Sequence, residues 1–80
     1  MEIQKFIEYF ASQFDETETS EFTSDTHFRN TEEWTSLTGM SVMVMIDEVY
    51  QVKMAAKDIQ NSETINDVFE ILKSRIESVV

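Results

Sequence analysis

The chain has 80 residues, of which 41% are hydrophobic, sixteen are acidic and six are basic. This length predicts a single domain over residues 1–80 with a thin core, which leaves little room for a deep enzyme cleft. The absence of cysteine excludes a disulfide scaffold, a thiolate metal site and a cysteine nucleophile, and a formal charge of −10 argues against nucleic acid as a direct partner.

The first predicted helix covers residues 2–14. Apolar residues recur there at helical spacing and form one stripe, made of Ile3, Phe6, Ile7, Phe10 and Phe14. Met1 leads directly into this charged amphipathic segment, so no signal peptide is expected. Because the chain has no proline and one glycine, tight hairpin turns are hard to form and an all-β fold is disfavoured.

Residues 15–35 form a polar predicted loop, rich in Thr, Ser and acids. A loop of about 20 residues is long for a compact domain and usually has a function or local structure. We expect Phe22 and Phe28 to anchor it, with Phe28 the better anchor because it lies nearer the next helix. His27 is expected to be exposed and without a catalytic role. The loop acids lack the central glycine of an EF-hand, so no metal site is predicted.

The second predicted helix covers residues 36–51 and is apolar on two sides. One arc holds Val42, Met43, Ile46, Val49 and Tyr50. A second arc of Leu37, Met40 and Val44 lies nearly opposite, flanked by Asp47, Glu48 and Gln51. So small a domain has difficulty burying a helix completely, so we expect the second arc to face a partner. The alternative is that the long loop covers it.

A short third helix is predicted over residues 55–61, with Ile59 pointing inward, and a fourth over residues 64–78. Thr64 and Asp67 match a helix-capping pattern, in which side-chain oxygens accept hydrogen bonds from free N–H groups. The apolar run from Met40 to Ile46 is much shorter than the roughly 18 residues of a membrane span, so no membrane insertion is expected. The sequence therefore predicts an all-α, small four-helix bundle, with three longer helices, a short third helix and a long first loop.

Ser36 stands where the polar loop turns into the apolar second helix, within Trp34-Thr35-Ser36-Leu37. Backbone N–H groups at a helix start are unpaired and partly positive, so a phosphate attached there is favoured. The alternative is that Ser36 or Thr35 only caps the helix, as both residue types do well. This tetrapeptide alone favours the cap.

A longer stretch resembles the modification region of acyl carrier proteins. Trp34-Thr35-Ser36-Leu37 is followed by Met40, Val44, Ile46, Asp47, Glu48 and Tyr50, and later by Asp58-Ile59 and Thr64-Ile65-Asn66-Asp67-Val68-Phe69. In that family a serine, usually within Asp-Ser-Leu, begins the second helix and accepts 4′-phosphopantetheine from coenzyme A as a phosphodiester. The resemblance is clearest from Phe28 to Ile76, and the length, acidity and four-helix layout agree with it.

The resemblance implies roles for individual residues. Ser36 would hold the phosphopantetheine group. The helix face read by partner enzymes would comprise Leu37, Met40, Val44, Asp47 and Glu48. The lining that can shelter an acyl chain in some members would comprise Phe28, Ile46, Ile59, Ile65 and Phe69.

Three residues depart from the family pattern. Thr35 replaces the acid that usually precedes the serine, and Thr38 and Ser41 replace acids often found in the first turns after it. Negative charge is shifted to Glu32 and Glu33 before the serine and to Asp47 and Glu48 beyond it. This pattern indicates a specialised or atypical member.

The leading hypothesis is a non-enzymatic carrier that holds acyl intermediates as thioesters on an arm at Ser36. It would deliver them to fatty-acid, polyketide or related biosynthetic enzymes. Its expected partners are a phosphopantetheinyl transferase and acyl-processing enzymes with basic patches, since the chain is acidic. The alternative is a non-catalytic helical interaction module, a degenerate carrier docking through the Leu37/Met40/Val44 face. In either case we expect a cytoplasmic monomer.

Overall fold

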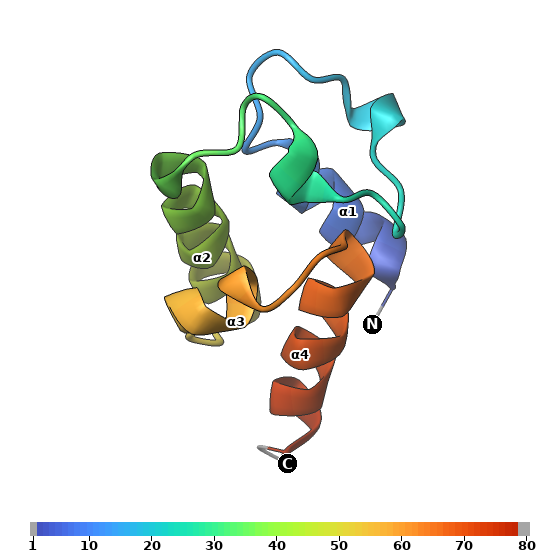
Figure 1. Cartoon of the computed structure of the whole chain (residues 1–80). Helices are drawn as coiled ribbons and strands as arrows, with labels where there is room; N and C mark the ends of the chain where they lie inside the picture. The colour runs from blue at the N-terminus through green and yellow to red at the C-terminus, as the bar shows by residue number, and fades with distance from the viewer. Residues whose placement is uncertain (1, 79–80) are drawn as a thin grey trace.

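The computed structural model describes residues 2–78 and contains four α-helices joined by loops (Figure 1). They are α1 (Ile3–Ala11), α2 (Ser36–Tyr50), α3 (Ala56–Gln60) and α4 (Ile65–Ser78). The long first loop carries two 3-10 helices, η1 (Thr19–Glu21) and η2 (Phe28–Asn30). No strand occurs within residues 2–78. The predicted all-α fold with three longer helices and a short third one is confirmed.

Helix α1 buries the middle of the predicted stripe, with Ile3 only partly buried, and ends before Phe14. Phe6, Ile7 and Phe10 are buried in it. It stops at Ala11 rather than at residue 14, and the Tyr9 carbonyl oxygen, which a longer helix would pair with the backbone N–H of Gln13, accepts side-chain donors there. The Ser12 hydroxyl donates to the Tyr9 carbonyl oxygen at 2.6 Å, and the backbone N–H of Gln13 bonds to the Phe10 carbonyl instead. The chain then turns into the long loop.

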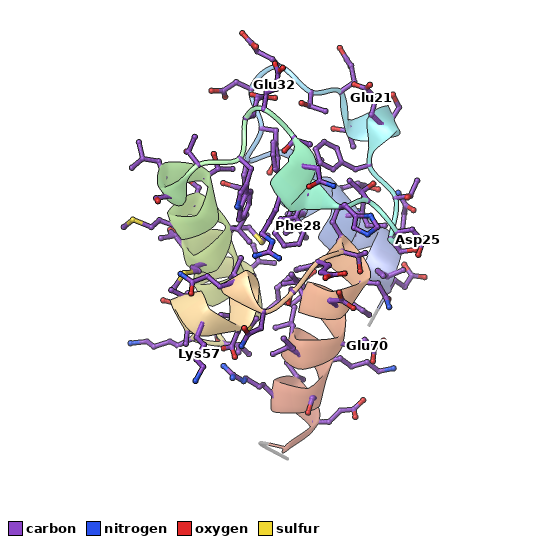
Figure 2. All side chains as sticks on the ribbon, viewed as in Figure 1. Glu21, Asp25, Phe28, Glu32, Lys57 and Glu70 are labelled. Carbon is purple, nitrogen blue, oxygen red and sulfur yellow. The ribbon has the colours of Figure 1, made fainter. Side chains whose placement is uncertain are left out.

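The long loop is fixed to the body by aromatic side chains, as predicted. Phe22 and Phe28 are both buried, and Phe28 lies inside the bundle while Glu21, Asp25 and Glu32 point outward (Figure 2). The Phe28 ring meets Trp34 with 4.7 Å between ring centroids. Two backbone hydrogen bonds add to this, because the N–H groups of residues 65 and 66 donate to the carbonyls of residues 26 and 24. The loop is thus ordered structure that joins α1, α2 and the start of α4.

Helix α2 differs from the prediction in how its apolar residues are divided. Val42 and Ile46 are buried as expected. Val49, expected inside, is 41% exposed, whereas Met45, assigned to neither arc, is buried. The buried side therefore includes Met45 rather than Val49. The helix ends where Gln51 adopts a left-handed conformation, with φ of 58°.

Side-chain caps set the starts of α3 and α4. The Asp67 carboxylate accepts the N–H groups of Glu63 and Thr64 at 3.0 and 3.1 Å, and the Thr64 hydroxyl oxygen accepts the Asp67 N–H at 3.2 Å. The predicted cap is confirmed. The Asp58 carboxylate likewise accepts the Ala55 N–H at 2.9 Å and pairs with the Arg75 guanidinium at 2.8 Å, which links α3 to α4.

No helix within residues 2–78 has the length and apolar character needed to cross a membrane.

Candidate functional site

Thr35 is the residue that caps α2. Its backbone is extended and its hydroxyl oxygen accepts the N–H of Thr38 at 3.3 Å. The Thr38 hydroxyl in turn donates to the Glu33 carbonyl at 2.7 Å. Of the two hydroxyl residues that the sequence offered as a cap, the structure uses Thr35.

Ser36 is therefore free of a capping role. It is the first residue of α2 and is exposed, and its hydroxyl has no hydrogen-bond partner among residues 2–78. The backbone N–H groups of Ser36 and Leu37 also have no acceptor within that range. They carry the partial positive charge of the helix start, and no acidic residue lies in the first turn of α2. Ser36 thus presents a free hydroxyl in surroundings that favour an attached anion.

A pocket of about 460 Å³ opens beside Ser36, between α2 and α3. Met40 and Met43 line it from α2, and Ile59 from α3. The remaining lining residues are Trp34, Thr35, Gly39, Ala56 and Gln60. Methionine side chains are flexible and can adapt to a flexible apolar guest. Trp34, Gly39, Ala56 and Gln60 were not assigned to a site from the sequence. The pocket combines apolar walls with a hydroxyl at its edge.

The expected acyl-lining residues are divided between the pocket and the core. All five (Phe28, Ile46, Ile59, Ile65 and Phe69) are buried. Only Ile59 lines the pocket beside Ser36. The other four lie in the packed core, where Phe28 meets Phe10 with 5.2 Å between ring centroids. The open space next to Ser36 is therefore bounded by helix surfaces and does not reach these four side chains.

The expected partner face is exposed, and the long loop does not cover it. Leu37 is 75% exposed, Met40 60% and Val44 54%. Asp47 and Glu48 are also exposed, near the other end of α2. At 1.5 Å per residue these acids lie roughly 17 Å along the helix from Ser36. The face is thus apolar near Ser36 and acidic near its far end.

Glu33 holds the loop against the start of α2. Its two carboxylate oxygens accept the backbone N–H groups of Asp15, Glu16 and Thr17 and the Thr17 hydroxyl. The Thr17 hydroxyl most of all, and then these N–H groups, keep the pKa of Glu33 below its ordinary value of 4.5 against an opposing desolvation effect. Of the two acids that precede Ser36, Glu33 uses its carboxylate to bind residues 15–17 of the long loop, whereas Glu32 points to solvent (Figure 2).

The remaining candidates from the sequence are His27 and the loop acids. His27 is exposed, as predicted. Within residues 2–78 no group of three or more His, Asp or Glu side chains is placed to hold a metal ion.

Comparison of the chain with protein-family models, with curated proteins and with solved structures finds no match.

Proposed function

We propose that the protein is a carrier whose Ser36 bears a 4′-phosphopantetheine arm. The observation that supports this most is that the two hydroxyl residues at the start of α2 have different roles. Thr35 caps the helix, which leaves the Ser36 hydroxyl exposed and without a hydrogen bond among residues 2–78.

The residues around Ser36 fit the group. A phosphodiester on the Ser36 oxygen would lie next to the unpaired N–H groups of Ser36 and Leu37. The pocket between α2 and α3 has apolar walls at Met40, Met43 and Ile59, which suit an alkyl chain. Gln60 in the same pocket offers a side-chain amide, which can pair with the amides of a pantetheine arm.

The chemistry assigns this chain a passive part. Ser36 would hold the group: its oxygen would bond to the pantetheine-bearing phosphorus, the pyrophosphate bond of coenzyme A would break with adenosine 3′,5′-bisphosphate as the leaving group, and a partner transferase would accept the hydroxyl proton. A bound arm would supply a thiol that can hold acyl groups as thioesters, and this chain has no thiol of its own because it has no cysteine. The chain itself positions the arm and presents α2 for recognition.

Co-expression with a broad-specificity phosphopantetheinyl transferase, followed by intact-mass measurement, tests the proposal. We expect a mass gain of one phosphopantetheine group in the parent chain and none in Ser36→Ala. Ser41→Ala is the matched control, because Ser41 is an exposed serine of the same helix; this variant should be modified like the parent. No gain in the parent chain, or a gain that survives Ser36→Ala, would contradict the proposal.

A second candidate is a helical interaction module that docks through Leu37, Met40 and Val44. The exposure of these three side chains favours it, because single exposed apolar residues are ordinary but a contiguous set marks a contact surface. In this case Ser36→Ala leaves partner binding and function unchanged, while Met40→Glu abolishes binding. Loss of function in Ser36→Ala with fold and docking intact would exclude this second candidate.

A further inference from the structure

The large apolar side chains left exposed by the fold gather in one place. Among the described residues, the exposed large apolar side chains are Tyr9, Leu37, Met40, Val44 and Val49, which are 39–75% exposed. All five line a single groove of about 630 Å³. Tyr9 comes from α1 and the other four from α2, so the groove lies along the junction of these two helices. Met40 belongs both to this groove and to the pocket beside Ser36.

Single exposed apolar side chains scattered over a surface are ordinary, whereas these five side chains lie together in one groove. A contiguous apolar patch with polar edges is typical of a contact site. Polar residues also line this groove, with Ser12 and Gln13 following α1 and Ser41 and Glu48 on α2. A groove between two packed helices has the shape that receives a third helix, whose apolar residues at helical spacing fit between the two ridges.

The charge around the groove restricts what such a helix can carry. Residues 6–28 and 30–52, which include most of α1 and all of α2, contain no lysine or arginine. The first stretch holds six carboxylates and the second holds four, including Glu48 in the groove itself. An acidic helix would meet only like charge here, whereas lysine or arginine beside an apolar stripe would find opposite charge on the adjoining surface.

We propose that the α1–α2 groove binds an amphipathic helix of a partner protein, with an apolar stripe flanked by basic residues. The proposal deepens the proposed function in naming the partner of the α2 face and in adding α1 to that face. It does not depend on modification of Ser36. A second copy of this chain is the alternative occupant, and it is disfavoured because it would place two molecules of charge −10 in contact.

The test uses the unmodified full chain and a synthetic peptide of about 15 residues, or four helical turns, with leucines on one face and lysines beside them. A scrambled peptide of the same composition keeps the charge but has no apolar stripe. We expect the peptide with the leucine face to shift the amide NMR signals of residues 9–13 and 37–49. We also expect it to bind at least tenfold more tightly than the scrambled peptide. Equal affinity of the two peptides would overturn the proposal.

Val44→Glu separates groove binding from general charge attraction. The substitution makes the chain more acidic, so general attraction predicts equal or tighter binding of a basic peptide. Burial of Val44 in the interface predicts binding at least tenfold weaker. Val44 is 54% exposed in the free chain, so the variant is expected to keep its fold, as circular dichroism will verify.

Lys73→Gln is the matched control, since it changes the net charge by the same amount at an exposed position of α4. It should leave the affinity within twofold, and so should Ser36→Ala. Unchanged affinity in Val44→Glu overturns the proposal. So does a dimer in light scattering that Val44→Glu dissociates, because a second copy would then occupy the groove.

Discussion

Adjacent hydroxyl residues at the start of α2 have different tasks. The Thr35 oxygen accepts a backbone N–H of the first turn, whereas the Ser36 hydroxyl contacts no partner among residues 2–78. Both side chains are polar, small and suited to capping, so sequence alone left their roles open. The backbone decides between them, since Thr35 is extended and Ser36 already helical.

Replacement of these two residues should therefore affect stability unequally. Thr35→Ala removes the cap and is expected to lower the free energy of unfolding by about 1 kcal/mol. Ser36→Ala removes no hydrogen bond within the fold and should change it by less than about 0.5 kcal/mol. Urea unfolding followed by circular dichroism measures both, and Thr35→Ser, which keeps a capping oxygen, should restore most of the loss. A larger loss in Ser36→Ala than in Thr35→Ala would show that Ser36 is the structural residue.

Glu33 should make the fold sensitive to acid through its bonds to Thr17 and the neighbouring backbone. Its pKa is lower in the folded chain than in the unfolded chain, so the ionised carboxylate stabilises the fold above the unfolded value near 4.5. That contribution is lost as the pH falls through the lower, folded value. Glu33→Gln should therefore be less stable than the parent at neutral pH, and the difference should shrink below pH 4.5.

Glu32→Gln provides the control for this effect. It removes the same charge from an exposed neighbour that has no hydrogen bond among residues 2–78. Both substitutions remove one negative charge and so relieve repulsion by a similar amount. The difference between the two variants in thermal unfolding, measured at a series of pH values, therefore reports the hydrogen bonds of Glu33. An equal response of both variants at every pH would mean that the bonds to residues 15–17 contribute nothing.

At the scale of elements, hydrophobic periodicity and capping patterns predicted those helices and caps that depend on residues close together in the sequence. The stripe of α1 and the Thr64–Asp67 cap of α4 are present because each depends on residues within a few positions of one another. Phe22 and Phe28 anchor the loop because few other apolar side chains are available there. Helix order, the α4 cap and the loop anchors thus follow from the sequence, whereas the early end of α1 at Ala11 does not.

What escaped prediction depends on distant residues. Both sides of α2 are apolar, so the exposure of Val49 and the burial of Met45 follow from how α2 packs in the bundle. Glu33 meets residues 15–17 across the long loop, and no local pattern marks such a contact. The pocket beside Ser36 needs α3 as its second wall, and the position of so short a helix is a matter of tertiary contacts.

Helix α3 should depend on the Asp58–Arg75 ion pair. A helix of five residues is not stable alone. Asp58 caps it and pairs with Arg75, whose guanidinium also donates to the Lys53 carbonyl at 3.3 Å. Asp58→Asn breaks the ion pair at a partly exposed site, a loss of about 0.5–1 kcal/mol. We expect amide hydrogen exchange of residues 56–61 to accelerate about two- to fivefold.

The exposed Lys57 of the same helix provides the control for Asp58→Asn. Lys57→Ala should leave the exchange of α3 unchanged, and neither substitution should alter exchange in α1. Unchanged exchange of residues 56–61 in Asp58→Asn would show that the ion pair with Arg75 does not stabilise the helix.

For the whole molecule, excess negative charge is the dominant electrostatic feature. The sixteen acidic residues cannot all find partners among six basic ones, and Glu21, Asp25, Glu32 and Glu70 all point away from the body (Figure 2). The radius of gyration is 11.6 Å, close to the Debye length of about 10 Å at 0.1 M salt. At low salt, carboxylates therefore repel one another across much of the molecule, and the same field attracts basic partners.

Salt should consequently raise the melting temperature. Between about 0.01 M and 1 M sodium chloride the Debye length falls from about 30 Å to about 3 Å, which screens the repulsion in the folded chain more than in the expanded unfolded chain. Relief of about 1 kcal/mol corresponds to a rise of about 4–8 °C for a domain of this size. A variant with Gln at Glu8, Glu32 and Glu70, exposed positions whose side chains have no hydrogen bonds among residues 2–78, should show a smaller rise. A melting temperature that falls with salt would mean that attractive pairs such as Arg75–Asp58 outweigh the repulsion.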